Sequence, residues 1–182
     1  MAGECLPAPE EPVFVARELA QYPKGKRALI VLSGGMDSTT MLYEYRAEIA
    51  LAVTFVYGAN HNAREAECEL LKKEVELSCR IWNLGIEHLV IPLGFMGEYF
   101  SSSLLEGADA IPSGHYDDQN MRSTVVPFRN GIMLAVAAGL AESRHLGVIM
   151  LANHSGDHAI YPDCRPAFVE AMGAAIAAGT YD

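Results

Sequence analysis

The 182-residue sequence lacks an apolar run long enough to cross a bilayer, and it carries few positive charges. Its longest apolar run, Gly131 to Ala141, falls well short of the ~18 residues that a spanning helix needs. Thirteen Lys and Arg against 23 Asp and Glu give a formal net charge of −10. A protein that binds nucleic acid through a basic face would show the opposite balance. We therefore expect neither a membrane nor a nucleic-acid partner.

The sequence also lacks the cysteine spacings of a disulfide framework or a zinc knuckle. Its four cysteines show no CxxC pair and are scattered along the chain, at Cys5, Cys68, Cys79 and Cys164. They therefore indicate reduced thiols, and no structural zinc site is expected. The first twelve residues are acidic and contain three prolines, without the basic and apolar regions of a secretion signal. These features favour a cytoplasmic globular protein.

Apolar strand-like runs alternate with helical periodicity after a Pro-rich beginning. Residues 1–26 are expected to form a leader with a short helix over Val13–Tyr22, followed by one α/β domain over residues 27–182. The expected strands are Arg27–Leu32, Ile49–Tyr57, His88–Ile91 and Val148–Ala152, and the expected helices are Asp37–Ala47, 62–83, 132–145 and Arg165–Ala178. Between Pro92 and Pro127 the alternation lapses, which predicts a lid, a binding loop or a disordered insertion. The alternation itself predicts a parallel sheet covered on both faces.

The strongest motif is Ser33-Gly34-Gly35-Met36-Asp37-Ser38-Thr39, which joins a buried strand to the start of a helix. Two glycines allow a sharp turn, and the helix N-terminus directs unpaired N–H groups and the positive end of its dipole at the same point. Three hydroxyls add donors, and Asp37 is suited to a divalent cation that bridges phosphates. The motif therefore predicts a pyrophosphate cradle, although it is not a Walker A loop. The alternative is a glycine turn with a serine or aspartate N-cap.

SGGMDS resembles the PP-loop of the adenine nucleotide α-hydrolase superfamily, whose members are ATP pyrophosphatases. Three further sequence motifs narrow the resemblance to the 7-cyano-7-deazaguanine (preQ0) synthase family of queuosine biosynthesis: Tyr57 to His61, Val126 to Asn130 and Gly156 to Arg165. Together with SGGMDS, these motifs extend the resemblance over about residues 27–179. It implies a three-layer, Rossmann-like α/β sandwich that uses ATP and Mg²⁺ to turn 7-carboxy-7-deazaguanine and ammonia into the nitrile. It also implies a homodimer.

The chain departs from the family pattern at several positions. Ala59 and Asn60 stand where the family commonly has a Gln and a basic residue, and Phe128 stands where it often has Gly. The family usually continues past the point that corresponds to Asp182, with a further strand, a helix and a four-cysteine zinc knuckle. We therefore expect the fold to lack that C-terminal part, and we carry over no zinc site.

The resemblance and the chemistry together give a candidate site. Asp37 and Arg129 are the candidate catalytic residues, with Asp37 also the magnesium ligand. The candidate substrate residues are Tyr57, His61, Arg129, Asn130, Asp157, Tyr161, Asp163 and Arg165. An arginine at a helix N-terminus opposes the dipole unless an anion lies nearby, which favours a functional role for Arg129. Structural alternatives exist: Asn130 as a helix cap, and Asp163 as the N-cap of the last helix.

Two other functions remain compatible with the PP-loop alone. One is another adenylating enzyme, such as a tRNA thiolase or an amidotransferase synthetase subunit, although neither would share the Tyr161-to-Arg165 motif. The other is a non-catalytic nucleotide-binding module.

Overall fold

The computed structural model describes residues 27–57, 85–102, 105, 125–153 and 161–181. Within these residues, four strands form one parallel sheet: β1 (Ala28–Val31), β2 (Ile49–Val56), β3 (Glu87–Pro92) and β4 (Val148–Leu151). The strand order is β3-β2-β1-β4, so β1 lies between β2 and β4. Val31, the last residue of β1, is paired with Val53 on one side and Leu151 on the other. The parallel sheet that the alternating pattern predicts is confirmed.

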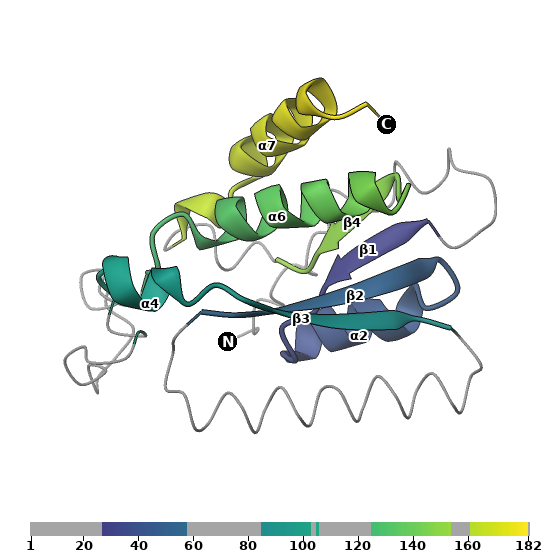
Figure 1. The fold of residues 1–182 in the computed structure, drawn as a ribbon, viewed down its shortest axis with the longest axis horizontal. Coiled ribbons are helices and arrows are strands. Elements are labelled where there is room, and N and C mark those ends of the chain that lie inside the picture. The colour runs from purple at the N-terminus through teal and green to yellow at the C-terminus, as the bar shows by residue number, and fades with distance from the viewer. Residues whose placement is uncertain (1–26, 58–84, 103–104, 106–124, 154–160, 182) are drawn as a thin grey trace, which may run out of the picture.

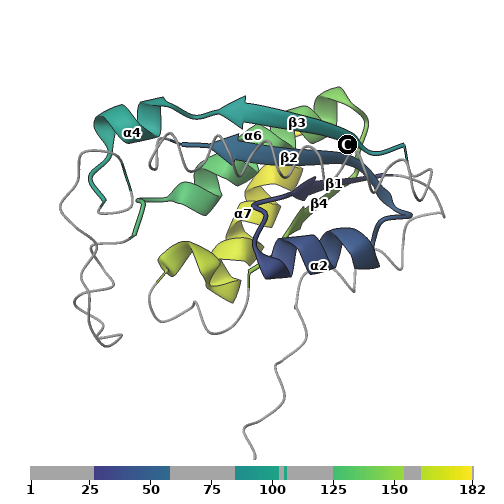
Figure 2. The same cartoon turned by 90° about the horizontal axis from the view of Figure 1, so that it is seen from below.

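Helices cover both faces of this sheet, as the two views show (Figures 1 and 2). On one face, α2 (Met36–Glu44) places Met41 and Leu42 against Ile30 and other apolar residues of the strands. On the opposite face, α6 (Arg129–Ser143) packs against Leu29, Val53 and their neighbours. Alternate residues of β1 thus supply the two cores, as the period of two in a strand requires. The three-layer α/β sandwich is therefore confirmed within the described residues.

The last helix, α7 (Pro166–Gly179), follows the short 3₁₀ turn η2 (Pro162–Cys164) and lies beyond α6 on the side away from α2 (Figure 1). It is rich in alanine and other apolar residues, yet none of its side chains is buried. No helix among the described residues is long and apolar enough to cross a membrane.

The predicted elements agree closely with those observed. Each strand boundary differs by at most one residue from its expected position, and each helix boundary by at most three. The prediction missed α4 (Phe95–Tyr99), a single helical turn at the start of the segment where the alternation lapses. Two expected helices, Val13–Tyr22 and residues 62–83, lie outside the described residues.

The N-terminus of α6 has an unusual backbone conformation. Phe128, the N-cap residue, has φ of 53° and lies in the left-handed region that favours glycine. Its exposed ring packs edge-on against Phe168 of α7, with the ring centroids 5.6 Å apart. A Cβ atom built on Gly131 would lie 2.3 Å from this ring, so the Phe128 side chain needs glycine at position 131.

We expect Gly131→Ala to lower the free energy of unfolding by about 1–3 kcal/mol, because the added methyl group must displace the Phe128 ring. The same substitution should be neutral or stabilising in a Phe128→Ala background, where alanine's higher helix propensity acts unopposed. Gly139→Ala is the matched control, because a Cβ there meets nothing within 4 Å. Urea denaturation of the unmodified protein, both single variants, the double variant and the control measures the coupling energy between positions 128 and 131. Equal effects of Gly131→Ala in both backgrounds would contradict the steric explanation.

Candidate functional site

The loop after β1 is closed by hydroxyl groups from its own residues. The backbone N–H of Ser33 donates to Ser38 Oγ over 3.2 Å, and Ser38 Oγ donates to the carbonyl of Gly35 over 3.1 Å. Ser33 Oγ lies 3.0 Å from Ser38 Oγ and accepts from the N–H of Gly35 over 3.3 Å. Gly34 has φ of 81°, a conformation that a side chain would strain. The sequence of the loop therefore specifies a tight turn directly before α2.

The N-terminus of α2 has no side-chain cap. Its N-cap residue is Gly35, so the alternative explanation, a serine or aspartate that caps the helix, is wrong. The amides of the first turn consequently keep their capacity to bind an anion, together with the positive end of the helix dipole. Asp37 is exposed in this first turn, beside the exposed Ser33, Gly34 and Gly35. This geometry is that of an anion cradle with one carboxylate at its rim.

Tyr57 and Arg129, which are 72 residues apart, lie in direct contact. Arg129 Nη1 donates to the Tyr57 hydroxyl over 3.1 Å, and its guanidinium carbon lies 5.8 Å from the centre of the Tyr57 ring. Tyr57 is buried and Arg129 is half-buried. Burial acts to lower the pKa of Arg129, but the neighbouring Tyr57 and the Asp163 carboxylate outweigh it and raise the pKa above its ordinary value. Arg129 is therefore a fixed cation at the start of α6.

A buried group of polar contacts joins the start of α6 to η2. The backbone N–H of Asn130 donates to Asp163 Oδ2 over 2.8 Å, and Asn130 Nδ2 donates to the carbonyl of Asp163 and to Cys164 Sγ, each over 3.2 Å. From the end of β4, Asn153 Nδ2 donates to the carbonyl of Cys164 over 3.2 Å. These contacts fix the turn that carries Asp163 against the first turn of α6.

Both capping alternatives from the sequence need correction. Asp163 is not the N-cap of the last helix, because Arg165 has that position in α7. Its carboxylate instead accepts the second amide of α6, a contact across 33 residues that local sequence patterns do not reveal. Asn130 is not a cap either, because Phe128 precedes the helix and Asn130 lies within it. The Asp163 contact also explains why α6 begins three residues earlier than expected.

The candidate residues collect at one edge of the sheet. The Ser33–Thr39 motif, which runs from the end of β1 into α2 and is called the anion loop below, follows β1. Tyr57 follows β2 and the η2 turn follows β4, and the carboxyl ends of parallel strands share one edge. Figure 2 shows α2, α6 and α7 all starting at the end to which the arrows of β2 and β3 point. Tyr161, half-buried, and Arg165, exposed, flank the same η2 turn. His61 and Asp157 lie outside the described residues.

Four residues that the sequence reasoning did not assign take part in this architecture. Cys164 and Asn153 hold the η2 turn, as described above. Thr54 and His88 form a hydrogen-bonded pair on β2 and β3, next to the end of β1. For Thr54 the sequence did contain a signal, because it is the one polar residue in the otherwise apolar strand Ile49–Val56.

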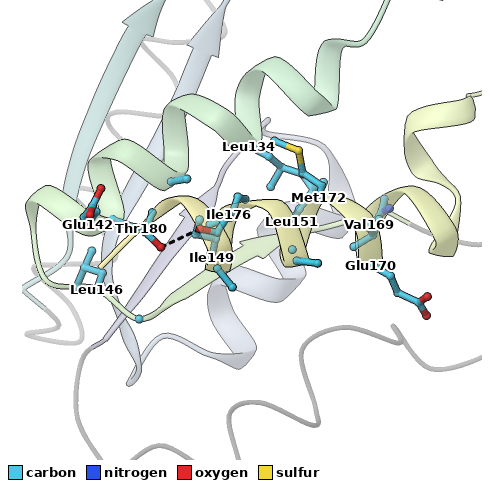
Figure 3. A pocket seen from close by; sticks show the side chains of 17 residues that line it. Leu134, Glu142, Leu146, Ile149, Leu151, Val169, Glu170, Met172, Ile176 and Thr180 are labelled. Atoms are coloured by element: carbon cyan, nitrogen blue, oxygen red, sulfur yellow. Dashed lines mark hydrogen bonds between the residues drawn. The ribbon is translucent and has the colours of Figure 1, made fainter. Parts of the chain in front are cut away.

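A cavity of about 490 Å³ lies between α6, β4 and α7 (Figure 3). Its walls are mainly aliphatic, with Leu134 from α6, Ile149 from β4, and Met172 and Ile176 from α7. Such walls offer little to a phosphate or a purine-like ring edge, which need polar partners. The polar groups described above lie instead at the carboxyl edge of the sheet.

Comparisons with known proteins identify the family of this chain. Residues 27–182 match the model of a protein family described as "Queuosine biosynthesis protein QueC". A 7-cyano-7-deazaguanine synthase from Porphyromonas gingivalis is 60% identical over 85% of this chain and 67% of its own length. The synthases of Desulfotalea psychrophila and of a Marinomonas species are 53% and 42% identical, over 84% and 82% of this chain and 67% and 65% of their own lengths. No solved structure matches.

The chain thus spans about two thirds of the length of these curated relatives. The family match begins at the first strand and runs through every element described above. It includes the anion loop, the Tyr57–Arg129 contact and the Asn130–Asp163 contact. The chain belongs to the QueC family of queuosine biosynthesis proteins.

Proposed function

We propose that this chain uses ATP to convert 7-carboxy-7-deazaguanine and ammonia into 7-cyano-7-deazaguanine, the product for which its relatives are named. The observation that carries the proposal is the parallel pairing of β1 with β4. This pairing brings the anion loop and the η2 turn to neighbouring positions on one edge of the sheet. A nucleotide held by the loop and an acid held by the turn can therefore meet.

The chemical problem is that a carboxylate oxygen is a poor leaving group. Attack of the carboxylate on the α-phosphate of ATP forms an acyl-adenylate and releases pyrophosphate. Ammonia then replaces AMP to give the amide. Attack of the amide oxygen on a second ATP, followed by loss of AMP, gives the nitrile. Both activations release pyrophosphate, whose developing negative charge the loop amides and the dipole of α2 would stabilise.

In this proposal Arg129 lies where two anions approach each other. The carboxylate and the triphosphate repel, and a fixed guanidinium between them lowers that repulsion while orienting both groups. Tyr57 holds the guanidinium through its hydroxyl and the face of its ring. Positioning and charge stabilisation are thus the main contributions of the protein to this step.

Asp37 is the residue suited to Mg²⁺. Among the residues that the structure describes, no three His, Cys, Asp or Glu side chains gather into a metal site. A cation that enters with the phosphates of ATP fits this arrangement, because Mg²⁺ commonly takes one or two carboxylates along with substrate phosphates. When bound, it would neutralise charge on the phosphates. We propose the exposed carboxylate of Asp37 as its protein ligand.

The ring of the acid carries N–H groups that require acceptors. We propose that Asp163 supplies one, through the carboxylate oxygen that does not accept the amide of Asn130. Asp157, His61, Tyr161, Asn130 and Arg165 stay predicted contributors to this pocket. The leader over residues 1–26, the homodimer, the cytoplasmic location and the lack of zinc also stay predictions.

Asp163→Asn should weaken binding of 7-carboxy-7-deazaguanine while leaving ATP binding unchanged. Asparagine keeps an oxygen for the amide of Asn130 but places an NH₂ group toward the ring, which leaves a ring donor without an acceptor. That loss costs about 1–3 kcal/mol, or roughly 5- to 150-fold in affinity. Calorimetric titration of the acid in the presence of a non-hydrolysable ATP analogue measures it.

Asn153→Ala is the control for this experiment, because it removes a hydrogen bond from the same turn without touching the carboxylate. Equal losses of acid affinity in both variants would assign Asp163 a structural role alone. If the unmodified protein has no affinity for the acid, the proposed function is wrong.

A further inference from the structure

The peptide group that joins Leu32 to Ser33 marks the point where β1 leaves the sheet and the anion loop begins. The N–H of Leu32 still donates to the sheet, to the carbonyl of Val53 over 2.8 Å. The carbonyl of Leu32 accepts from a side chain, the hydroxyl of Thr54, also over 2.8 Å. A side chain of β2 thus reaches the first peptide group of the loop.

This peptide group is held from both sides. A peptide unit is planar, so the carbonyl of Leu32 and the N–H of Ser33 turn together. Thr54 holds the carbonyl from the sheet, and Ser38 Oγ of α2 accepts the N–H over 3.2 Å. The orientation of this peptide plane sets the direction in which the chain leaves the sheet and enters the loop. Each of the two contacts restrains the same plane, so the loss of either one loosens the start of the loop.

His88 of β3 fixes Thr54 in turn. Thr54 Oγ1 and His88 Nε2 are 2.9 Å apart. A threonine hydroxyl has one proton, and that proton is directed at the carbonyl of Leu32, so His88 must donate from Nε2. Thr54 is almost completely buried, with 3% of its surface exposed, where a valine of the same shape would suit the strand equally well. Its hydroxyl therefore has a purpose beyond forming the strand.

We propose that Thr54, oriented by His88, is a positioning residue that aims the anion loop at the pyrophosphate of ATP. The proposal rests on the proposed function for the identity of the ligand, and it adds two residues that do not touch the ligand. The hydrogen bonds run from β3 through β2 to the end of β1, and so connect three adjacent strands to the loop.

Thr54→Val tests this proposal, with Thr54→Ser as the conservative variant and Ile49→Val as the matched control. Ile49 is fully buried on the same face, at the opposite end of β2. Thr54→Val should raise the KM for ATP about tenfold, as expected for the loss of one buried hydrogen bond, and leave the KM for the acid unchanged. Thr54→Ser should restore the KM for ATP. Ile49→Val should change neither KM, because partial unfolding lowers only the apparent kcat.

His88 supplies the second comparison. His88→Gln keeps an N–H near the position of Nε2 and should leave the KM for ATP within about twofold of the unmodified value, whereas His88→Leu should raise it. Adding His88→Leu to Thr54→Val should raise it no further, because His88 acts through Thr54.

Calorimetric binding of inorganic pyrophosphate with Mg²⁺ separates this proposal from the proposed function. If the unmodified protein binds pyrophosphate but does not turn over the acid, the proposed function is wrong. Weaker pyrophosphate binding by Thr54→Val would then still support the positioning role. If Thr54→Val binds pyrophosphate and ATP as tightly as the unmodified protein, or if Thr54→Ser fails to restore binding, the positioning role is wrong. Absence of any pyrophosphate binding by the unmodified protein would overturn both.

Discussion

Replacing Arg129 by methionine should lower kcat/KM for the ATP-dependent conversion of the acid by about 10²–10³-fold. Methionine preserves the aliphatic bulk of the side chain but removes the charge that offsets repulsion between carboxylate and triphosphate. The contact with Tyr57 holds the guanidinium in place before any ligand binds, so the side chain loses little conformational entropy during the reaction. Arg129→Lys should recover only part of the activity, because an ammonium lacks the planar fork of donors. The rate of pyrophosphate release measures kcat/KM for the unmodified protein and for both Arg129 variants.

Arg144→Met is the matched control. Arg144 immediately follows the same helix, at the other end from Arg129, where it is exposed and paired with Glu87. Its loss removes one positive charge from the protein without touching the candidate site, so turnover should be unchanged. An Arg129→Met protein that is folded by circular dichroism and retains full kcat/KM would refute the assigned role.

Asp37→Asn should reduce ATP-dependent turnover by about a hundredfold and shift the Mg²⁺ concentration for half-maximal activity upward by about tenfold. Asparagine has the same shape but is a much weaker ligand for a hard cation, and a bound metal contributes several kcal/mol of charge stabilisation. The fold should lose only about 0.3–1 kcal/mol, because Asp37 is exposed and interacts with the protein mainly through the helix dipole. A magnesium titration of initial rates measures the shift.

Glu44→Gln provides the comparison for Asp37. Glu44 is exposed at the last residue of α2, so the substitution removes the same charge from the same helix but far from the loop. Its magnesium dependence should equal that of the unmodified protein. An identical shift in both variants would point to a general effect of net charge, and no shift in Asp37→Asn would remove Asp37 from the metal site.

The sheet could be predicted from the sequence because its strands are compact apolar runs. Ala28–Val31 is buried along its whole length, and such a run has few other stable placements than the centre of a parallel sheet. The tight turn after β1 was predictable for a similar reason, because the glycines and the hydroxyl residues that form it fall within seven adjacent residues. In both cases the physical cause is local in the sequence.

The contacts that the sequence did not predict join distant residues. Asp163 precedes α7 in the sequence, so neighbouring residues offered an N-cap of that helix as the structural alternative to a role in substrate binding. Its carboxylate instead accepts an amide of α6, and only the packed structure brings them within 2.8 Å. Thr54 is similar, since its partners Leu32 and His88 are 22 and 34 residues away. Local propensity carries no information on such pairs.

The central place of β1 in the sheet has a consequence for the order of folding. In the sequence, a short segment separates β1 from β2, whereas most of the described residues lie between β1 and β4. Closing the longer loop costs more chain entropy, and contacts between residues far apart in sequence form more slowly. We expect β1, β2 and the anion loop to associate before β4 joins the sheet. The loop that we propose for the nucleotide would therefore exist in the folding chain before the turn that we propose for the acid.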